Sequence, residues 1–580
     1  MNLLLDGLTV LIAQFSGIFL FLVSAFGIGY GIREFLTAGN ELPRWVRLVE
    51  SILLGTLLLG CYSLALVILE QLWTPIFFIG SSLVPIASAI PLILTARNKG
   101  IKRLSAPDAA MGGIYICSFV LFLLTRLAFL KSILLPLDTD SPNHYKIVQG
   151  FLTPRVGNIT LHSLVKSAAH FYHVGFHSLA AVFAVIAHTD PATSIAVLGQ
   201  ILISLSPFSL LWLIYAITHN GRAAWVTGLF AGLVWQMPYF AVNWGKYPAI
   251  AGLSLAPAVL GFWVVYGREV RKHWPHILIL TLLTITLGLL HTRLFICLAL
   301  AGGIYFIVQR FFRGHIFSLW EKAFLWLLGL AAFIPFQESL ISYYSINQWI
   351  GIVTIALFMF FAFQTFPHLS MGLTLFLFGV WAASQISIRR HLVLLDQPFI
   401  DTMLFIPISV FIGIGFAGIS EKLASKDLLQ PLLAIAIGGV VLTGIYASRT
   451  FYPDACCNYV KPADMSAINW IRTNTSQKAV VMAAGFRSGN YMIGTDAGMW
   501  VSELTGRNTN QLIFNFNWSS TTAIGKVCKP RYPEVYIYKG GMANSFDEIQ
   551  LDKQTWIQTD FASNGIIVYH VLCNQGSRVP

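Results

Sequence analysis

Residues 137–146 read Leu-Asp-Thr-Asp-Ser-Pro-Asn-His-Tyr-Lys and interrupt a long hydrophobic region. Two carboxylates, a histidine and a lysine occur together there, after a nearly continuous series of apolar segments. Ser141-Pro142 predicts a helix start, with the serine as N-cap and the proline at the first helical position. Asp138 and Asp140 would then lie in the loop before the helix, with His144 on its first turn pointing back toward them.

The composition around this stretch is that of a membrane protein. Only 11% of the 580 residues are charged, and the mean hydropathy is +0.70. Apolar runs of about 18 or more residues recur up to residue 446, which predicts a polytopic α-helical membrane protein with about 14 transmembrane helices. The expected spans are 8–31, 49–70, 73–95, 111–135, 192–217, 223–242, 248–266, 276–290, 294–309, 323–336, 348–366, 370–387, 402–419 and 428–446.

The positive charges predict the orientation of these spans. The net charge is +12 and the pI about 9.3, but the basic residues occur in short loops of alternating parity. This pattern disfavours nucleic-acid binding and marks one side as cytoplasmic. The N-terminus, the 137–146 stretch and the chain after Tyr446 are then extracytoplasmic, and we expect an integral protein of a prokaryotic plasma membrane.

Three regions follow from this reading. Residues 1–450 form the transmembrane domain, which includes an extracytoplasmic loop at 136–190. In that loop Lys166, His170, His173 and His177 share one helical face, which predicts a helix lying in the membrane interface. Residues 451–580 form a small extracytoplasmic α/β domain, with a helix at 464–474 capped by Asp464 and strands near 479–483, 534–538 and 565–569.

The seven cysteines divide between these regions. Cys61, Cys117 and Cys297 lie in apolar spans and are expected to be small core residues. Two disulfides are compatible with an extracytoplasmic C-terminal domain, although adjacent cysteines rarely pair with each other, and the pairing stays open. The four cysteines concerned are Cys456, Cys457, Cys528 and Cys573.

The acidic stretch is the strongest candidate for chemistry. Asp138 or Asp140 could accept a proton from a hydroxyl group as a general base. Together with His144 they could instead hold a divalent metal such as Mg²⁺ or Mn²⁺. The alternative is a solvated loop with a capping aspartate, although two carboxylates at the end of a span are costly to place there without a function.

Several basic side chains are candidates for binding a phosphate. Lys246 lies between aromatic residues in an outward loop, and Arg293 lies in a charged outward turn. Arg389 and Arg390 form an outward pair that breaks the charge rule, unless the span count is wrong by one there. Arginine suits phosphate because its planar fork matches the phosphate oxygens.

Aromatic and histidine side chains near these positions are candidates for contacting a sugar or an acceptor. Trp244 and Tyr247 flank Lys246 and serve equally well as interface anchors or as a stacking surface for a sugar. His173 and His177 belong to the histidine face, which favours an interfacial stripe over a metal site.

The layout resembles the GT-C superfamily of integral membrane glycosyltransferases. The stretch Leu137-Asp138-Thr139-Asp140…His144 is similar to the acidic motif in an outward loop of that superfamily. Tyr172-His173-Val174-Gly175-Phe176-His177 resembles the segment that often follows the motif. Segments 470–475 and 494–500 resemble uncharacterised bacterial members with a C-terminal domain. Here the acidic loop follows the fourth span rather than the first.

The resemblance implies an inverting glycosyltransferase that uses a polyprenyl-phosphate-linked sugar donor and a glycan, lipid or protein acceptor. It implies that Asp138 or Asp140 is the general base, and that Lys246, Arg293, Arg389 and Arg390 bind the donor phosphate. Two other functions remain open. A flippase or polymerase-type transporter of envelope glycan would carry charges at mid-depth in its spans, and a non-catalytic scaffold would not depend on the two aspartates.

Overall fold

The computed structural model describes most of the chain. The described residues are 2–36, 43–70, 73, 75–99, 106–153, 173–267, 274–344, 348–389, 392–423, 429–447, 450–489 and 491–573. Lys166, His170 and Arg390 lie outside them.

The chain folds into two compact units that draw on different parts of the sequence. The helical unit contains Met1–Lys131, Gly150–Val242 and Lys246–Tyr452. The sheet unit contains Pro453–Pro580 and two short stretches from far upstream, Ser132–Gln149 and Asn243–Gly245. The acidic stretch therefore belongs structurally with the C-terminal residues.

The helical unit contains ten helical segments of sufficient length and apolarity to cross a membrane, counted over the described residues. They are Phe15–Leu36, Trp45–Leu69, Ile76–Leu94, Ala110–Ser132, Pro191–Thr218, Tyr247–Tyr266, Arg293–Phe311, Leu319–Tyr343, Pro367–Gln385 and Gln397–Lys422. The prediction of a polytopic helical membrane protein with a small C-terminal α/β region is confirmed.

The helices and short strands of this unit follow in chain order. They are α1 (Asn2–Ala13), α2 (Phe15–Leu36), α3 (Arg44–Leu69), α4 (Ile76–Lys99), α5 (Ala106–Leu127), η1 (Ala128–Ser132), α8 (Gly175–Ala187), α9 (Pro191–Thr218), α10 (Gly221–Leu233), η2 (Tyr239–Val242), α11 (Tyr247–Tyr266), α12 (Trp274–Leu290), α13 (Arg293–Phe311), α14 (Leu319–Ala332), η4 (Ile334–Phe336), α15 (Gln337–Tyr343), α16 (Gln348–Thr365), α17 (Pro367–Gln385), β1 (Ser387–Arg389), β2 (Leu392–Val393), α18 (Gln397–Met403), α19 (Phe405–Lys422) and α20 (Leu429–Ala447).

Two of the expected spans differ from the structure. The expected span 223–242 is shorter, because α10 ends at Leu233 ahead of Pro238, whose ring restricts the preceding backbone and removes a donor. The expected span 8–31 is divided between α1 and α2. Three further expected spans, 276–290, 348–366 and 428–446, correspond to the apolar helices α12, α16 and α20, which are not among the ten candidate spans counted over the described residues.

The expected interface helix in the 136–190 loop is also wrong where the structure describes it. His173 precedes α8, and α8 is buried on almost every side against α2, α3, α4 and α9. His177, on its first turn, is fully buried. The apolar run from Gly175 to Ala187 explains this, because it has no polar face to turn toward water.

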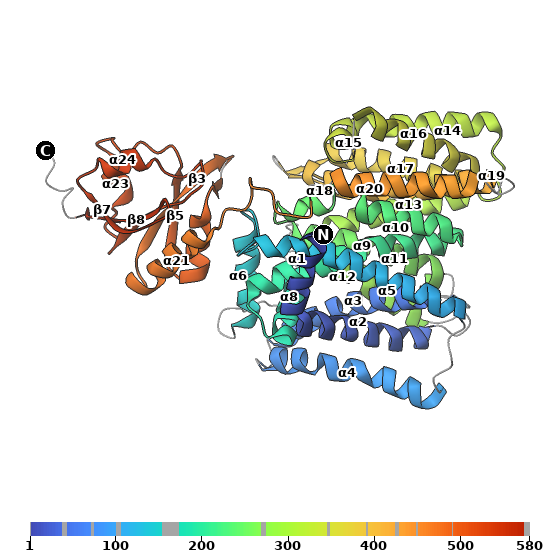
Figure 1. Ribbon diagram of the computed structural model, residues 1–580, viewed down its shortest axis with the longest axis horizontal. Helices are drawn as coiled ribbons and strands as arrows, with labels where there is room; N and C mark the ends of the chain where they lie inside the picture. The colour runs from blue at the N-terminus through green and yellow to red at the C-terminus, as the bar shows by residue number, and fades with distance from the viewer. Residues whose placement is uncertain are drawn as a thin grey trace. The chain divides into compact units, whose positions relative to one another are not determined.

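The core of the helical unit is built around α9 and α11. α9 begins at an N-cap, Asp190, whose carboxylate accepts from the backbone N–H groups of Ala192 and Thr193 at 2.9 and 3.1 Å. Most of the side chains of α9 and α11 are buried, and α10 packs beside α9 (Figure 1). Continuous burial explains why these helices are apolar on all sides.

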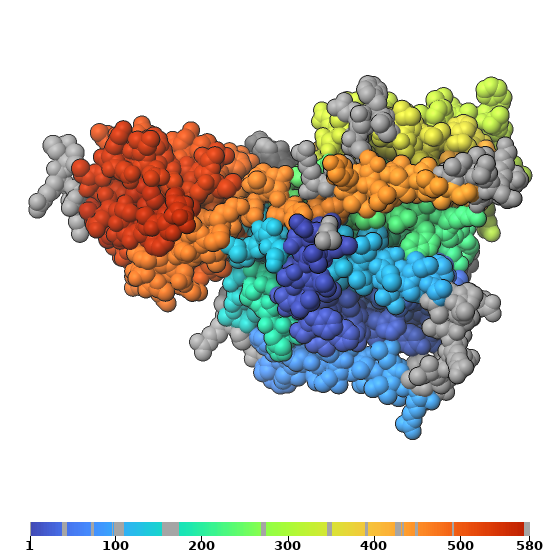
Figure 2. Space-filling model, in the orientation of Figure 1, coloured from blue at the N-terminus to red at the C-terminus, as the bar shows by residue number. Residues whose placement is uncertain are grey.

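Peripheral helices present apolar side chains outward. Figure 2 shows the blue surface of α1 against the cyan surface of α5. Gly7 permits this approach, since an added Cβ would lie 2.0 Å from the carbonyl oxygen of Leu124. Elsewhere Ile316, Trp320 and Phe311 are among the most exposed large apolar side chains. Apolar surface of this kind is suited to contact with lipid tails.

A buried ion pair joins α2 and α3 within the helical unit. The guanidinium of Arg33 donates to the carboxylate of Glu50 at 3.0 Å and to that of Glu34 at 2.9 Å. The hydroxyl of Tyr266, on α11, donates to the second oxygen of Glu50. Arg33 and Glu50 are only 2% and 0% exposed, so each charge depends on its partner.

The sheet unit contains a six-stranded mixed sheet. The strand order is β4-β3-β6-β8-β7, and β5 pairs in parallel with β3. β6 is also parallel to β3, whereas β4, β7 and β8 make antiparallel pairs. The elements of the unit are α6 (Ser141–Leu152), α21 (Pro462–Asn474), β3 (Val480–Ser488), β4 (Tyr491–Gly494), η5 (Ala497–Trp500), α22 (Val501–Thr505), β5 (Asn508–Ile513), α23 (Ala523–Val527), β6 (Val535–Lys539), α24 (Glu548–Asp552), β7 (Ile557–Ser563) and β8 (Ile566–Val571).

Helices lie on both faces of this sheet (Figure 1). α21 packs against β7 and β8, where Trp470 contacts the rings of Tyr536 and Phe561. On the other face Val527 of α23 and Leu551 of α24 join the buried core. α21 begins at Pro462, so Asp464 lies inside its first turn and accepts from the backbone N–H of Lys461, rather than acting as the N-cap.

Candidate functional site

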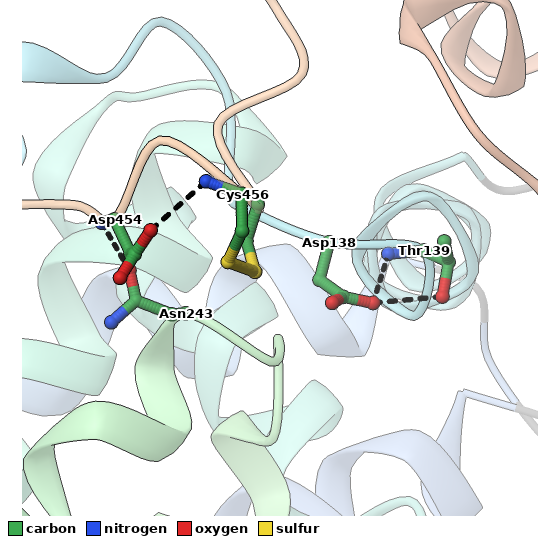
Figure 3. Close-up of a disulfide and its surroundings, with 6 residues drawn as sticks. Asp138, Thr139, Asn243, Asp454 and Cys456 are labelled. Carbon is green, nitrogen blue, oxygen red and sulfur yellow. Dashed lines mark hydrogen bonds between the residues drawn. A yellow bond between two sulfur atoms is a disulfide. The ribbon is translucent and has the colours of Figure 1, made fainter. Parts of the chain in front are cut away.

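Asp138 has a backbone conformation that is uncommon for its residue type. Its φ is +64°, in the left-handed region that non-glycine residues rarely adopt. One carboxylate oxygen accepts hydrogen bonds from the backbone N–H and the hydroxyl of Thr139, the latter at 2.8 Å. Figure 3 shows the Asp138 carboxylate turned toward Thr139. A strained residue held this firmly is a candidate for a functional role.

The residues after the last membrane helix hold this loop in place. The backbone N–H of Asp138 donates to the carbonyl of Cys457 at 3.2 Å, and the amide of Asn458 donates to the carbonyl of Ser132 at 3.1 Å. Cys456 and Cys457 form a disulfide, which lies between Asp454 and Asp138 in the view of Figure 3. These contacts connect the acidic loop to the C-terminal segment.

A third segment completes the support. The buried side chain of Asn243 accepts from the backbone N–H of Asp454 at 2.8 Å, and the carboxylate of Asp454 accepts from the N–H of Cys456 at 3.0 Å (Figure 3). Gly245 has a φ of +62°, and an added Cβ would lie 2.9 Å from the carbonyl oxygen of Leu137. The backbone of Gly245 therefore lies directly against the acidic loop.

The helix after the loop begins at Ser141, one residue earlier than expected. The Ser141 hydroxyl donates to the carbonyl of Leu137, so this serine is not the N-cap. His144 is buried, and its Nε2 is 3.0 Å from the carbonyl oxygen of Gly245. Its ring thus contacts the 243–245 segment, and the expectation that it faces the aspartates stays a prediction.

The expected three-residue metal site is not assembled. Among the described residues, which include Asp138, Asp140 and His144, no three His, Cys, Asp or Glu side chains are grouped to hold a metal. One oxygen of Asp138 accepts from Thr139, and Nε2 of His144 lies beside a backbone carbonyl.

α6 also contacts the folded C-terminal region. The ring of Tyr145 meets the buried ring of Trp500 edge to face, with centroids 5.7 Å apart. Lys146 lies 3.8 Å from the carboxylate of Glu503. Because Lys146 is largely exposed, this ion pair contributes little, and the Tyr145–Trp500 contact is the stronger attachment.

A buried acidic group lies just before η5. Asp496 is fully buried, and its carboxylate accepts from the Ser545 hydroxyl at 2.6 Å and from the Gly498 N–H at 2.9 Å. Burial, with a smaller contribution from the nearby Asp464, raises the pKa of Asp496 to about 6 against these hydrogen bonds.

A second polar cluster lies in the helical unit, where α12 passes into α13. His291, Thr292 and Arg293 are consecutive, and each has a buried side-chain atom without a hydrogen-bond partner within the described part of the chain. These atoms are Nδ1 of His291, Oγ1 of Thr292 and Nε of Arg293. Buried polar atoms are nearly always paired, so three in succession indicate a place for a polar ligand.

The surroundings of this run are basic and aromatic. His291 stacks on Phe399 with ring centroids 5.0 Å apart and lies 4.5 Å from the His173 ring. Burial lowers the pKa of His291 well below its usual value, and the neighbouring His173, Arg293 and Lys246 lower it further. His291 is therefore neutral and can either donate or accept a hydrogen bond.

Arg293 also makes an ion pair across the cluster. One of its terminal nitrogens lies 2.8 Å from the carboxylate of Asp396, the N-cap of α18. Asp396 is therefore not merely a solvated loop residue. Asp401, on α18 itself, is buried, and its carboxylate accepts from Ser339 and Gln397 at 2.6 and 2.7 Å.

The remaining predicted residues have different environments. Tyr247 is 1% exposed and stacks on Phe176, so it is a core residue rather than a surface for a sugar. Trp244 is half-buried. Arg389 ends β1, but its side chain, like all of Arg390, lies outside the described residues. His177 belongs to the helix core.

The structure defines the class of membrane protein, and a comparison with protein families then identifies the family. The ten candidate spans and the C-terminal sheet define a polytopic membrane protein with an appended α/β unit. Residues 35–396, more than half the chain, match a family of unknown function, DUF6541, and the chain belongs to this family.

The sequence and structure comparisons gave the following results. No curated protein matches the sequence. The structure is similar to that of the arabinofuranosyltransferase AftD from mycobacteria, with a TM-score of 0.47 and 10% sequence identity. The likeness covers 81% of this chain and 40% of that one, so the chain spans less than half the length of AftD.

Proposed function

We propose that this protein is a membrane glycosyltransferase that transfers a sugar from a polyprenyl-phosphate donor to an acceptor hydroxyl at the extracytoplasmic face. The observation that carries the proposal is the run His291-Thr292-Arg293 at the start of α13, in which each residue has one buried polar atom without a hydrogen-bond partner among the described residues. Leaving a buried polar atom unpaired costs about 1–3 kcal/mol, and a phosphate would satisfy all three.

The chemistry of the run fits a phosphate better than a neutral ligand. Arg293 supplies a guanidinium, Thr292 a hydroxyl and neutral His291 a ring nitrogen. The N-terminus of the 19-residue α13 adds the partial positive charge of a helix start. Lys246 contributes a further positive charge close enough to influence His291. A phosphate carried on a lipid can reach such a position from the membrane.

The acidic loop supplies the second requirement of the reaction. Asp138 or Asp140 accepts the proton of the acceptor hydroxyl as its oxygen bonds to the anomeric carbon. The bond from that carbon to the phosphate oxygen breaks, and its electron pair leaves with the lipid phosphate. Attack opposite to the leaving group inverts the anomeric configuration. The supports around Asp138 would keep the carboxylate positioned for this step.

Transport of a lipid-linked glycan is the second candidate function. It is favoured by charged groups within the helices, namely the Arg33–Glu50 pair and the buried Arg126, which lies 3.7 Å from the Tyr239 ring centroid. Charges inside spans often mark a transport pathway. Here, however, each of these groups is packed against a partner, as in a structural core.

The test is sugar transfer by the full-length protein in membranes, using a panel of polyprenyl-phosphate hexoses and pentoses. We expect Asp138→Asn or Asp140→Asn to lower transfer by at least about a hundredfold, the effect typical of losing a general base. Asp560→Asn is the matched control, because Asp560 is a carboxylate on β7 whose closest charged partner is His570, at 3.8 Å, rather than a residue of the acidic loop.

The outcome separates the two candidates if folding is checked in the same membranes. Loss of transfer in one aspartate variant, with normal insertion and Asp560→Asn unaffected, supports the enzyme and assigns the base. Wild-type transfer in both variants would show the proposed mechanism to be wrong. Donor movement across the membrane without transfer would favour transport.

A further inference from the structure

A cavity of about 480 Å³ opens in the sheet unit at the amino ends of its parallel strands. Three chain segments line it, 477–480 before and at the start of β3, 508–510 at the start of β5, and 531–533 before β6. β3 pairs in parallel with both other strands, which brings the three segments together. A volume of this size suits a small polar ligand.

The lining is polar and positively charged. Only Val480 and Pro533 are apolar, and no carboxylate is among the lining residues. The other lining residues are Gln477, Lys478, Asn508, Thr509, Asn510, Arg531 and Tyr532. An apolar ligand would leave these groups unpaired, and a metal cation would find no anionic ligand.

One wall of the cavity is fixed by its own contacts. The Tyr532 hydroxyl accepts from the amide of Asn510 at 2.5 Å and from the guanidinium of Arg531 at 3.1 Å. The segment that leads to this wall is joined to the end of the chain by the disulfide between Cys528 and Cys573. The guanidinium of Arg531 and the amide of Asn510 are thus positioned before any ligand arrives, which lowers the entropic cost of binding.

We propose that this cavity binds an acidic saccharide, a sugar unit that carries a carboxylate or a phosphate. Amide side chains can donate to and accept from sugar hydroxyls at the same time. Arg531 and Lys478 pair with the acidic group. In the proposed glycosyltransferase, this cavity would bind the acceptor, which would then be an acidic glycan. The role in acceptor binding rests on the proposed function, whereas the binding of an acidic saccharide does not.

The test measures binding to the full-length protein in nanodiscs by isothermal titration calorimetry. The probes are trigalacturonate for a carboxylate, glucose 6-phosphate for a phosphate, and maltotriose as the neutral comparison. We expect one acidic probe to bind at least about tenfold more tightly than maltotriose. The double variant Lys478→Gln/Arg531→Gln should lose at least about tenfold of that affinity.

Matched variants make the result decisive. Lys553→Gln removes an exposed charge that does not line the cavity and should leave binding unchanged. Asp138→Asn should bind the acidic probe normally even if transfer is lost, which separates this inference from the proposed reaction. The inference is overturned if neither acidic probe binds saturably, if maltotriose binds equally well, or if the double variant binds like the wild type. Tighter binding of a short oligothymidylate at the same residues would also overturn it, in favour of nucleic acid.

Discussion

The backbone N–H of Asp138 donates a hydrogen bond to the carbonyl oxygen of Cys457, at 3.2 Å. In the sequence, most of the candidate membrane helices lie between these two residues. On its other side the acidic loop meets Gly245, whose carbonyl contacts the ring of His144. The geometry of the loop is therefore set by two distant segments, and it should respond to changes in either.

Replacing Gly245 with alanine should displace the acidic loop. The φ of +62° disfavours a side chain by about 1–2 kcal/mol, and the new Cβ would lie 2.9 Å from both the Leu137 carbonyl oxygen and the Ser141 hydroxyl. We expect kcat for transfer to fall at least about tenfold, with little change in KM for the donor.

Gly489→Ala is the matched control for this change. Gly489 has a φ of +58°, but an added Cβ there would lie in open space. It therefore repeats the backbone strain without the contact to the loop. If both variants lose the same activity, general destabilisation explains the effect, and the close approach of Gly245 has no special role.

Arg293→Gln should weaken donor binding. The substitution removes the guanidinium from the His291-Thr292-Arg293 run, together with its ion pair to Asp396, and leaves the other residues at the start of α13 unchanged. We expect KM for the polyprenyl-phosphate donor to rise at least about tenfold, because a charge-assisted contact to phosphate is lost. Arg310→Gln, at the other end of α13, is the control in steady-state transfer assays. An unchanged donor KM in Arg293→Gln would remove Arg293 from the proposed phosphate site.

Glu50→Ala should destabilise the helical unit, because it leaves the buried Arg33 with one carboxylate instead of two. Breaking a buried ion pair costs about 3–5 kcal/mol. We expect a lower unfolding temperature in detergent and a lower yield of inserted protein. Glu34→Ala, which removes the more exposed partner, should cost less. The double variant Arg33→Leu/Glu50→Leu should recover much of the stability, and failure to recover would show that packing rather than charge dominates.

Asp496 should make the stability of the sheet unit depend on pH. Its pKa of about 6 in the folded state lies above the ordinary 3.8, so the protonated carboxyl favours folding. This contribution is complete below pH 3.8 and is lost as the pH rises through 6. Between about pH 5 and pH 8 the loss is about 1.4 kcal/mol. Hydrogen exchange of β3 and β6 amides in the full-length protein measures it.

Asp496→Asn isolates this group from the others that titrate nearby. The variant cannot lose a proton, so its amide protection should vary less with pH than that of the wild type. A pH dependence identical to that of the wild type would assign the effect to neighbouring groups such as Asp464.

The sequence predicted the class of fold because hydrophobic length is a local property. Apolar runs such as 191–218 contain enough information to identify a buried membrane helix. The division of the 151–190 region was not predicted correctly, because the polar residues around His173 hid the apolar run that forms α8. The buried partner of Arg33 was also missed, since Glu50 lies at the start of the expected span 49–70 and nothing local pairs it with Arg33.

The candidate site was predicted only in part. The two aspartates and Arg293 stand out by residue type, but their supports do not. Nothing local indicates that Asn243 accepts from Asp454, or that Gly245 lies against Leu137. Only the glycine and asparagine next to Trp244 hinted at a tight turn. The residues predicted to bind the donor phosphate did not include His291 and Thr292. The roles of Arg389, Arg390 and Trp244 stay predictions.

The sheet unit combines segments that are far apart in the sequence, and this has a consequence for biosynthesis. The acidic loop leaves the ribosome early, but the residues that hold it begin only at Pro453. From Gln149 to Pro453 is 304 residues, or roughly 15–60 s of translation at about 5–20 residues per second. During this interval the loop lacks its C-terminal partners. A nascent chain, or one truncated before Pro453, should therefore be inserted in the membrane yet inactive, so that maturation of the loop is the last step of assembly.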